Sequence, residues 1–197
     1  MALDGPYTVE DLLRMTGHRS KKDFVAPEVP ASSRRSPVKT RRIIGVDPGT
    51  RILGYGVIEH NPLTNTLKWI AHGTMEPCKT LALPQRLQCI FEELEEVIAR
   101  TRPDIAAIEE TFAGINMKSA IAMGQGRGVA LLALARAKLD IAEISPRSIK
   151  KAVTGSGASG KEHVAAMVCA TLGLKEIPKP EDTTDALACA IALARRM

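Results

Sequence analysis

The chain has 197 residues, and its hydrophobic content of 45% is sufficient for one packed globular domain together with a tail. No apolar run approaches the roughly 20 residues of a membrane span, and the four cysteines form no C-x-x-C pair, so a membrane protein, a zinc site and a disulfide framework are disfavoured. The formal net charge is +5, and residues 111–181 contain ten basic against five acidic side chains, which favours a phosphate-rich partner over an ordinary solvated face.

Residues 1–41 are predicted to form a mobile basic N-terminal extension that precedes a globular domain at 42–197. The extension is rich in proline, serine and paired arginines, and its one weak helical signal is Thr8–Leu13. Its basic side chains would either contact nucleic acid or simply keep the segment solvated.

Three strands are predicted next. The apolar run Ile43–Val46 is followed by the turn formers Pro48 and Gly49 and by a second apolar stretch up to Glu59, which is typical of a hairpin. Residues 67–74 are predicted as a third strand. Asp47 therefore stands at the end of a buried strand, either as a functional carboxylate or merely as the first residue of the turn.

A parallel crossover follows the hairpin. Apolar residues recur at helical spacing over residues 85–100, and a short apolar run at 105–108 comes after this helix. The order strand, helix, strand predicts that the run at 105–108 lies beside the first strand in the centre of the sheet. A second carboxylate thus reaches a strand end, but periodicity alone does not choose between Glu109 and Glu110.

Two glycine-rich segments need separate interpretations. Residues 124–128 read G-x-G-x-G inside a helix predicted at 119–138. This pattern indicates close packing of that helix face and does not match a dinucleotide-binding loop.

After a short strand predicted at 141–144, residues 155–162 nearly match a nucleotide-binding phosphate loop. Glu162 replaces the metal-binding hydroxyl of that motif, although Lys161 at a helix start can still hold a DNA phosphate.

The last predicted element is an apolar helix up to Ala194, and Asp182 and Asp185 lie on one face of its first turn. Ordinary helix-start chemistry also explains two aspartates at this place. If they converge with the carboxylates at the strand ends, hard oxygen ligands without histidine or cysteine favour Mg²⁺ or Mn²⁺. Such an arrangement is typical of a two-metal phosphodiester site.

Four segments together resemble the RuvC family of bacterial Holliday junction resolvases: residues 45–50, 107–112, 124–128 and 182–188. The resemblance covers residues 42–197 and implies an α/β, ribonuclease H-like domain with a mixed five-stranded sheet flanked by helices. It also implies that the catalytic metal ligands are Asp47, Glu109, Asp182 and Asp185, and so it selects Glu109 over Glu110.

Further site residues follow from the same resemblance. Phe112 would stack on a base of the opened junction, and the alternative is a core phenylalanine. Lys150 and Lys161 would contact DNA phosphate near the cut. Arg127 and its neighbouring glycines would lie on a helix that helps to form a dimer.

The function implied by the resemblance is a Mg²⁺-dependent endonuclease that resolves four-way DNA junctions by symmetric paired nicks, in recombination and repair. It would act in the cytoplasm as a homodimer with two Mg²⁺ ions per site, for which Mn²⁺ would substitute, and with the RuvA–RuvB branch-migration complex as a partner. The alternatives are a junction-binding protein that does not cut, a relative that acts on RNA ends, and an actin-like ATP-binding protein. The last of these would need a second phosphate-binding turn and about twice the length.

Overall fold

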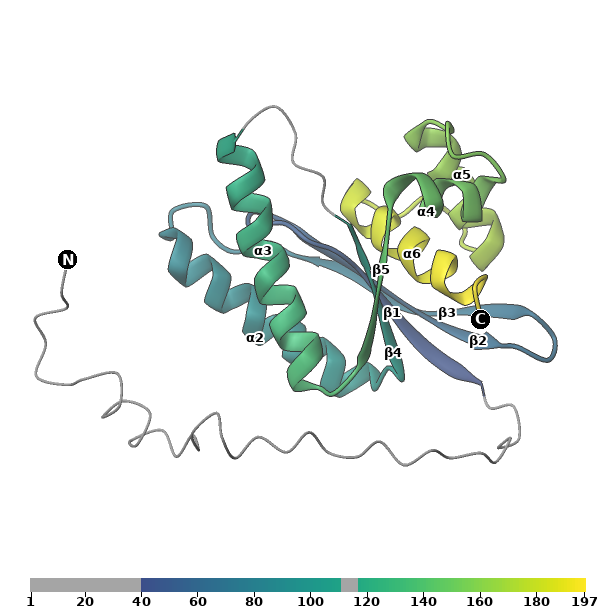
Figure 1. The fold of residues 1–197 in the computed structure, drawn as a ribbon, viewed down its shortest axis with the longest axis horizontal. Coiled ribbons are helices and arrows are strands. Elements are labelled where there is room, and N and C mark those ends of the chain that lie inside the picture. The colour runs from purple at the N-terminus through teal and green to yellow at the C-terminus, as the bar shows by residue number, and fades with distance from the viewer. Residues whose placement is uncertain (1–39, 111–116) are drawn as a thin grey trace, which may run out of the picture. The chain divides into compact units, whose positions relative to one another are not determined.

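A five-stranded mixed sheet forms the centre of the molecule. The computed structural model describes residues 40–110 and 117–197, so the predicted extension, apart from its last two residues, and Phe112 lie outside the described residues. In chain order the elements are β1 (Arg41–Asp47), β2 (Leu53–Asn61), β3 (Thr66–Met75), α2 (Leu83–Thr101), β4 (Ile105–Glu109), α3 (Met117–Arg136), β5 (Asp140–Ile144), α4 (Pro146–Thr154), α5 (Lys161–Leu172) and α6 (Glu181–Ala194). The strand order is β3-β2-β1-β4-β5 (Figure 1).

The register of the sheet confirms the predicted hairpin and crossover. β1 is antiparallel to β2, β2 is antiparallel to β3, and β4 runs parallel to both β1 and β5. The crossover through α2 places β4 beside β1, as the order of elements required. The carboxyl ends of β1 and β4 therefore meet at one edge of the sheet.

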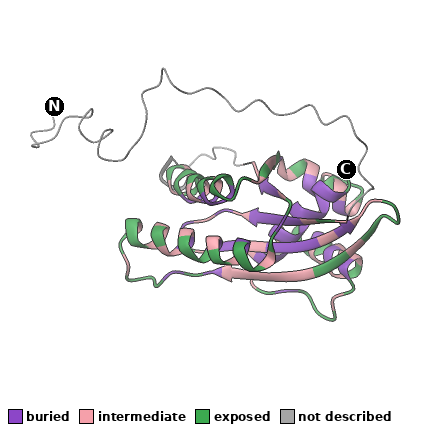
Figure 2. Cartoon of the chain, turned by 90° about the horizontal axis from the view of Figure 1, so that it is seen from below, coloured by how far each residue is buried: buried purple, intermediate pink, exposed green. Residues whose placement is uncertain are grey.

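Helices cover both faces of this sheet, and each face has its own hydrophobic core. α2 and α3 cover one face, where Ile44, Val46 and Ile108 are buried. α4, α5 and α6 cover the other face, where Ile43 and Ala107 are buried. Buried residues accordingly run through the inner strands, while exposed residues gather on the outer helix surfaces (Figure 2).

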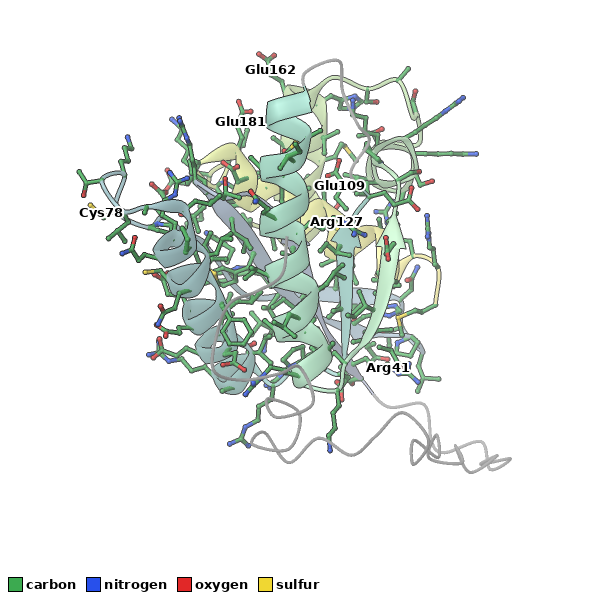
Figure 3. All side chains as sticks on the ribbon, turned by 60° about the vertical axis from the view of Figure 1, so that its left-hand side comes forward. Arg41, Cys78, Glu109, Arg127, Glu162 and Glu181 are labelled. Carbon is green, nitrogen blue, oxygen red and sulfur yellow. The ribbon has the colours of Figure 1, made fainter. Side chains whose placement is uncertain are left out.

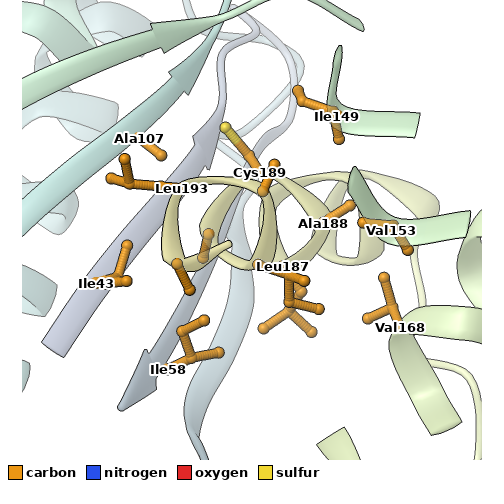
Figure 4. Close-up of a cluster of buried hydrophobic side chains, with 14 of the residues drawn as sticks. Ile43, Ile58, Ala107, Ile149, Val153, Val168, Leu187, Ala188, Cys189 and Leu193 are labelled. Carbon is orange, nitrogen blue, oxygen red and sulfur yellow. The ribbon is translucent and has the colours of Figure 1, made fainter. Parts of the chain in front are cut away.

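α6 is the most completely buried helix among the described elements. Every residue from Ala186 to Ala194 is buried, and the helix packs along β1 and β2 (Figure 4). Small side chains make this close approach possible, and Gly54 on β2 is one of the points of contact. A Cβ at Gly54 would overlap the main chain of Asp182, so only glycine allows α6 to lie at this depth.

Helix ends differ from the predictions in two places. α3 ends at Arg136, two residues before the predicted end, because Lys138 has a positive φ of 59° that stops the helix. α4 had no counterpart among the predicted elements. It begins at Pro146 after Ser145, whose hydroxyl accepts a hydrogen bond from the backbone N–H of Ser148 at 3.4 Å, and this is a local cap signal.

Among the helices of the described residues, none combines the length and the apolar character required to cross a membrane.

Candidate active site

Asp47 and Glu109 project from the ends of neighbouring strands onto the same face of the sheet. Side chains alternate along a strand, so Asp47 shares a face with Ile43, and Glu109 shares a face with Ala107. Ile43 and Ala107 both belong to the core beneath α6. The two carboxylates therefore lie on the α6 side, at the end of the sheet opposite to the start of β1 at Arg41 (Figure 3).

Glu110 takes a different position. Its backbone N–H donates a hydrogen bond to the carbonyl of Ile144 at 2.9 Å, which extends the pairing of β4 with β5 by one residue. Because successive side chains along a strand point to opposite faces of the sheet, the side chain of Glu110 points away from the face that carries Glu109. The structure thus places Glu109, and not Glu110, on the face that carries Asp47.

α6 brings the two remaining carboxylates to this edge. Gly54 lies opposite Asp47 in the β1–β2 ladder and also supports the main chain of Asp182. The hydroxyl of Thr184 donates a hydrogen bond to the carbonyl of Pro178 at 3.2 Å, and this contact fixes the entry of the chain into α6. The first turn of the helix therefore carries Asp182 and Asp185 next to the end of β1.

Mutual repulsion and burial disfavour the charged forms of these carboxylates. Burial, together with the negative charges of Asp185, Glu109 and Asp182, raises the pKa of Asp47 to about 7, while Lys161 opposes the shift. Burial is also the main reason that the pKa values of Glu109 and Asp185 are raised. For Asp185 this effect outweighs the lowering by the adjacent Lys161 ammonium.

Two lysines complete the cluster. Lys150 of α4 and Lys161 of α5 line a small cleft of about 70 Å³ together with Glu109 and Asp185. The Nζ of Lys161 lies 3.5 Å from an Oδ of Asp185 and 3.4 Å from an Oε of Glu181. Asp185 raises the pKa of Lys161, so this lysine carries a positive charge beside the carboxylates.

Lys161 is the first residue of α5, and Gly160 is its N-cap. The segment that resembles a nucleotide-binding loop is therefore a helix start that presents one lysine to the carboxylates, while Glu162 is exposed. Sequence reasoning did not identify Glu181, which pairs with Lys161. No spacing rule connects the two residues, and only the first-turn position of Glu181 in α6 indicates that it lies near the site.

Cys189 lies on the buried side of the carboxylate cluster. It lies one helical turn after Asp185, it is fully buried, and Figure 4 shows it on the side of α6 that meets the sheet. Burial raises the pKa of its thiol, and the charges of Glu109 and Asp47 act in the same direction. The thiol therefore stays protonated and provides a neutral, apolar surface on the buried side of the carboxylates.

The donor set of the cluster fits a hard divalent cation. Within residues 40–110 and 117–197, no group of three or more acidic, histidine or cysteine side chains is placed so that it could hold a metal ion, so these residues form no cage of protein ligands. Mg²⁺ does not require such a cage, because it usually keeps several waters and binds one or two carboxylates together with substrate phosphates. Carboxylates whose pKa values are raised by burial and by mutual repulsion gain from such a cation.

α3 contributes a close contact on the other side of the hairpin turn. A Cβ at Gly126 would lie 2.6 Å from the carbonyl oxygen of Gly49, so the predicted close packing is present at this glycine. Gly124 and Gly128 have open space instead. The guanidinium of Arg127 is held inside the domain by an ion pair with Glu143 of β5.

A larger cavity, of about 710 Å³, lies around His60, Thr171 and Arg195. It contains none of the predicted site residues and lies at the other end of β2 from Gly54, which contacts Asp182. The small cleft is the better candidate for an active site, because carboxylates with raised pKa values and two lysines lie together there.

Comparison with known proteins gives a consistent result. The family model described as "Crossover junction endodeoxyribonuclease RuvC" matches residues 43–193. The chain is 47% identical over 150 residues to a protein of that name from Dehalococcoides mccartyi, covering 76% of this chain and 90% of the relative. It is 46% identical to the protein of the same name from Bordetella pertussis, covering 78% of this chain and 82% of the relative.

Solved structures agree with the fold. Thermus thermophilus RuvC, solved in complex with a Holliday junction substrate, superimposes with a TM-score of 0.72 at 32% identity, over 77% of this chain and 92% of that chain. The yeast mitochondrial Holliday junction resolvase has a TM-score of 0.57 at 12% identity, over 81% and 82% of the two chains, and supports the fold alone. The ribonuclease H-like architecture predicted from the sequence is thus confirmed, and the chain belongs to the RuvC family of crossover junction endodeoxyribonucleases.

Proposed function

We propose that this protein is a metal-dependent endonuclease that resolves four-way DNA junctions. The observation that carries the proposal is the convergence of carboxylates from β1, β4 and α6 with two lysines beside them. Membership of the RuvC family supports the choice of a DNA junction as the substrate, because a relative with this fold was solved with a Holliday junction.

Asp47, Glu109, Asp182 and Asp185 would hold two Mg²⁺ ions, for which Mn²⁺ would substitute. When bound, these ions supply a water nucleophile at neutral pH and stabilise the charge on the leaving oxygen. The carboxylates would fix the positions of these ions relative to the protein, and the buried Cys189 keeps water away from the inner side of the carboxylates.

Lys150 and Lys161 act on the DNA. Both line the cleft with Glu109 and Asp185, and each ammonium would donate hydrogen bonds to non-bridging phosphate oxygens as negative charge develops there. Lys161 is also bound to Asp185 and Glu181, so it holds the phosphate and the carboxylates in one network. Phe112, which lies outside the described residues, keeps its predicted role of stacking on a base.

A homodimer would supply two such sites for paired nicks. The exposed face of α3 supports this proposal, since it carries Ile121, Gly124, Gln125, Gly128 and Leu132 at helical spacing. Small and apolar residues on one exposed face allow two helices to pack closely. Cooperation with the RuvA–RuvB complex and a cytoplasmic location stay predictions from the sequence.

The test is cleavage of a synthetic four-way junction, with linear duplex as the control substrate, in Mg²⁺, in Mn²⁺ and in chelator. The wild type is expected to make paired nicks in the junction alone and only with metal. Asp47→Asn should bind the junction without cutting it, whereas Asp140→Asn, at the opposite end of the sheet, should cut normally. A wild type that binds the junction but never cuts it in either metal would favour a binding protein instead.

A further inference from the structure

A β-bulge in the edge strand β3 brings the side chain of Trp69 next to that of His72. In the ladder with β2, Ile58 pairs with Trp69 and Val57 pairs with Ala71, so Ile70 is an extra residue. Residues three positions apart in a regular strand point to opposite faces, but the bulge turns Trp69 and His72 to the same side. Their ring centroids lie 5.3 Å apart with the planes inclined at 45°.

These two rings form one wall of a groove of about 530 Å³, and residues 174–179, between α5 and α6, form the other. The indole of Trp69 is only partly covered, because 41% of the residue is exposed. Lys175 and Lys179 line the groove and are also exposed, against one acidic lining residue, Glu176. The groove therefore combines an accessible aromatic face with net positive charge.

The groove shares a wall with a pocket that borders the candidate active site. Residues 177–179 also line a pocket of about 200 Å³ whose other walls include Lys161, Glu181 and Asp185. Lys179 thus belongs to both spaces. Three lysines thus line the two spaces: Lys161 beside the carboxylates, Lys179 on the shared wall, and Lys175 in the groove with Trp69.

The shared wall is held in place before any ligand arrives. The hydroxyl of Thr184 donates to the carbonyl of Pro178 at 3.2 Å, as described above for α6. At the other end of the wall, the backbone N–H of Leu174 donates to the carbonyl of Cys169 at 3.0 Å, and the thiol of Cys169 donates to the carbonyl of Leu174 at 3.1 Å. A preformed wall reduces the entropy that a bound strand must overcome.

We propose that this groove binds DNA next to the cut position, with Lys175 and Lys179 on the phosphates and the Trp69 indole stacked on an unpaired base. The inference rests on the proposed function. A basic groove with an aromatic side chain is the usual arrangement for single-stranded nucleic acid, because every base has a face that can stack. Burial lowers the pKa of His72, so its neutral ring supports the indole without adding charge.

The sequence offers a direct probe of this contact, since Trp69 is the one tryptophan in the chain. The emission of Trp69 is measured in the full-length Asp47→Asn protein, which should leave the DNA intact, during titration with a four-way junction, a single-stranded oligonucleotide and a blunt linear duplex. The expected result is quenching by the junction and by the single strand, at the concentrations at which a mobility shift shows binding. Unchanged emission while the junction is fully bound would overturn the proposal.

Variants in the otherwise wild-type chain test the energy of the same contact. Trp69→Ala should weaken junction binding by about tenfold, as expected for the loss of one stacked base, and Trp69→Phe should restore most of it. Lys175→Gln should reduce the slope of log affinity against log salt by about 1. The matched control Lys138→Gln, on an exposed turn next to β5, should leave both quantities unchanged.

The outcomes separate the groove from the proposed function. If the junction is cut normally while Trp69→Ala and Lys175→Gln bind it like the wild type, the resolvase function stands and the groove serves another ligand, such as a protein. If the wild type neither binds nor cuts the junction, the proposed function fails and the groove proposal fails with it. Because the fluorescence titration keeps Trp69 in place, it remains decisive even if Trp69→Ala does not fold.

Discussion

Gly54 supports the main chain of Asp182, because a Cβ at this position of β2 would overlap the carbonyl group of that aspartate. Gly54 is also the ladder partner of Asp47. One residue without a side chain therefore sets the distance between a carboxylate on the sheet and a carboxylate on the helix.

Gly54→Ala should therefore displace α6. Both the stability of the fold and the cleavage of the junction depend on the position of this helix. We expect a loss of about 1–3 kcal/mol in the free energy of unfolding, as for other overpacked contacts, together with a loss of junction cleavage. Urea denaturation and the cleavage assay measure the two effects. Lys138→Gln, on an exposed turn away from the site, is the control and should retain the stability and the cleavage of the wild type. Equal stability of Gly54→Ala and the wild type would contradict the close contact.

The metal-free protein should lose stability as the pH rises from about 4 to about 7. Asp47 has its pKa raised from 3.8 to about 7 in the folded state, so the folded state holds a proton that the unfolded state has already released. Stability is therefore highest below the lower pKa and declines up to the higher one, by at most about 4 kcal/mol. Thermal unfolding in chelator across this range checks the slope, and Asp47→Asn should reduce it, while Glu109 and Asp185, whose pKa values are also raised, retain part of it.

Divalent cations should reverse that decline. At pH 7.5, Mg²⁺ or Mn²⁺ is expected to raise the melting temperature of the wild type, because binding to the folded state alone stabilises it by mass action. The increase should disappear in Asp47→Asn and in Asp185→Asn, while Asp140→Asn should retain it. A melting temperature of the wild type that does not respond to either metal would argue against the carboxylates as ligands.

The lysines of the cleft should matter for cleavage far more than their neighbours. Lys150→Met and Lys161→Met each remove an ammonium from the cleft that is proposed to bind the phosphate, and each should slow junction cleavage by about 10²-fold or more. Lys151→Met is the matched control for Lys150, since Lys151 is the next residue of α4 and is exposed. Single-turnover rates at saturating protein measure the chemical step without the contribution of binding. A normal rate for Lys161→Met would remove this residue from the proposed mechanism.

The exposed face of α3 should control the oligomeric state. Leu132 is 54% exposed at this face, and Leu132→Glu would place a charge in the proposed contact between two helices. We expect the variant to be monomeric by light scattering and to nick the two strands of a junction independently. A wild type that is monomeric at micromolar concentration would contradict the homodimer.

The sequence was most informative where the signals are local. Pro48 and Gly49 mark the hairpin turn, and the apolar period over residues 85–100 marks α2, so the crossover and the pairing of β1 with β4 followed from topology. The choice between Glu109 and Glu110 did not follow from alternation. β4 is buried on both faces, with Ala107 in one core and Ile108 in the other, so its sequence contains no polar–apolar alternation to read.

Other features depend on contacts between distant parts of the chain. The bulge at Ile70 is visible only in the register of β3 with β2, and the pairing of Glu181 with Lys161 requires α5 and α6 to be placed first. The family resemblance supplied the set of carboxylates that periodicity left open. Their role as metal ligands stays a prediction until the metal titrations above are made.

The four carboxylates come from two different elements, since the sheet carries Asp47 and Glu109 and the helix α6 carries Asp182 and Asp185. A sub-ångström sliding of α6 along β2 would change every distance between the two pairs at once, while leaving the distances within each pair nearly constant. If the carboxylates hold metal ions as proposed, the depth at which α6 lies on the sheet would set the ion radius that the site prefers. Substitutions in the small residues beneath α6 could tune that preference without altering any ligand.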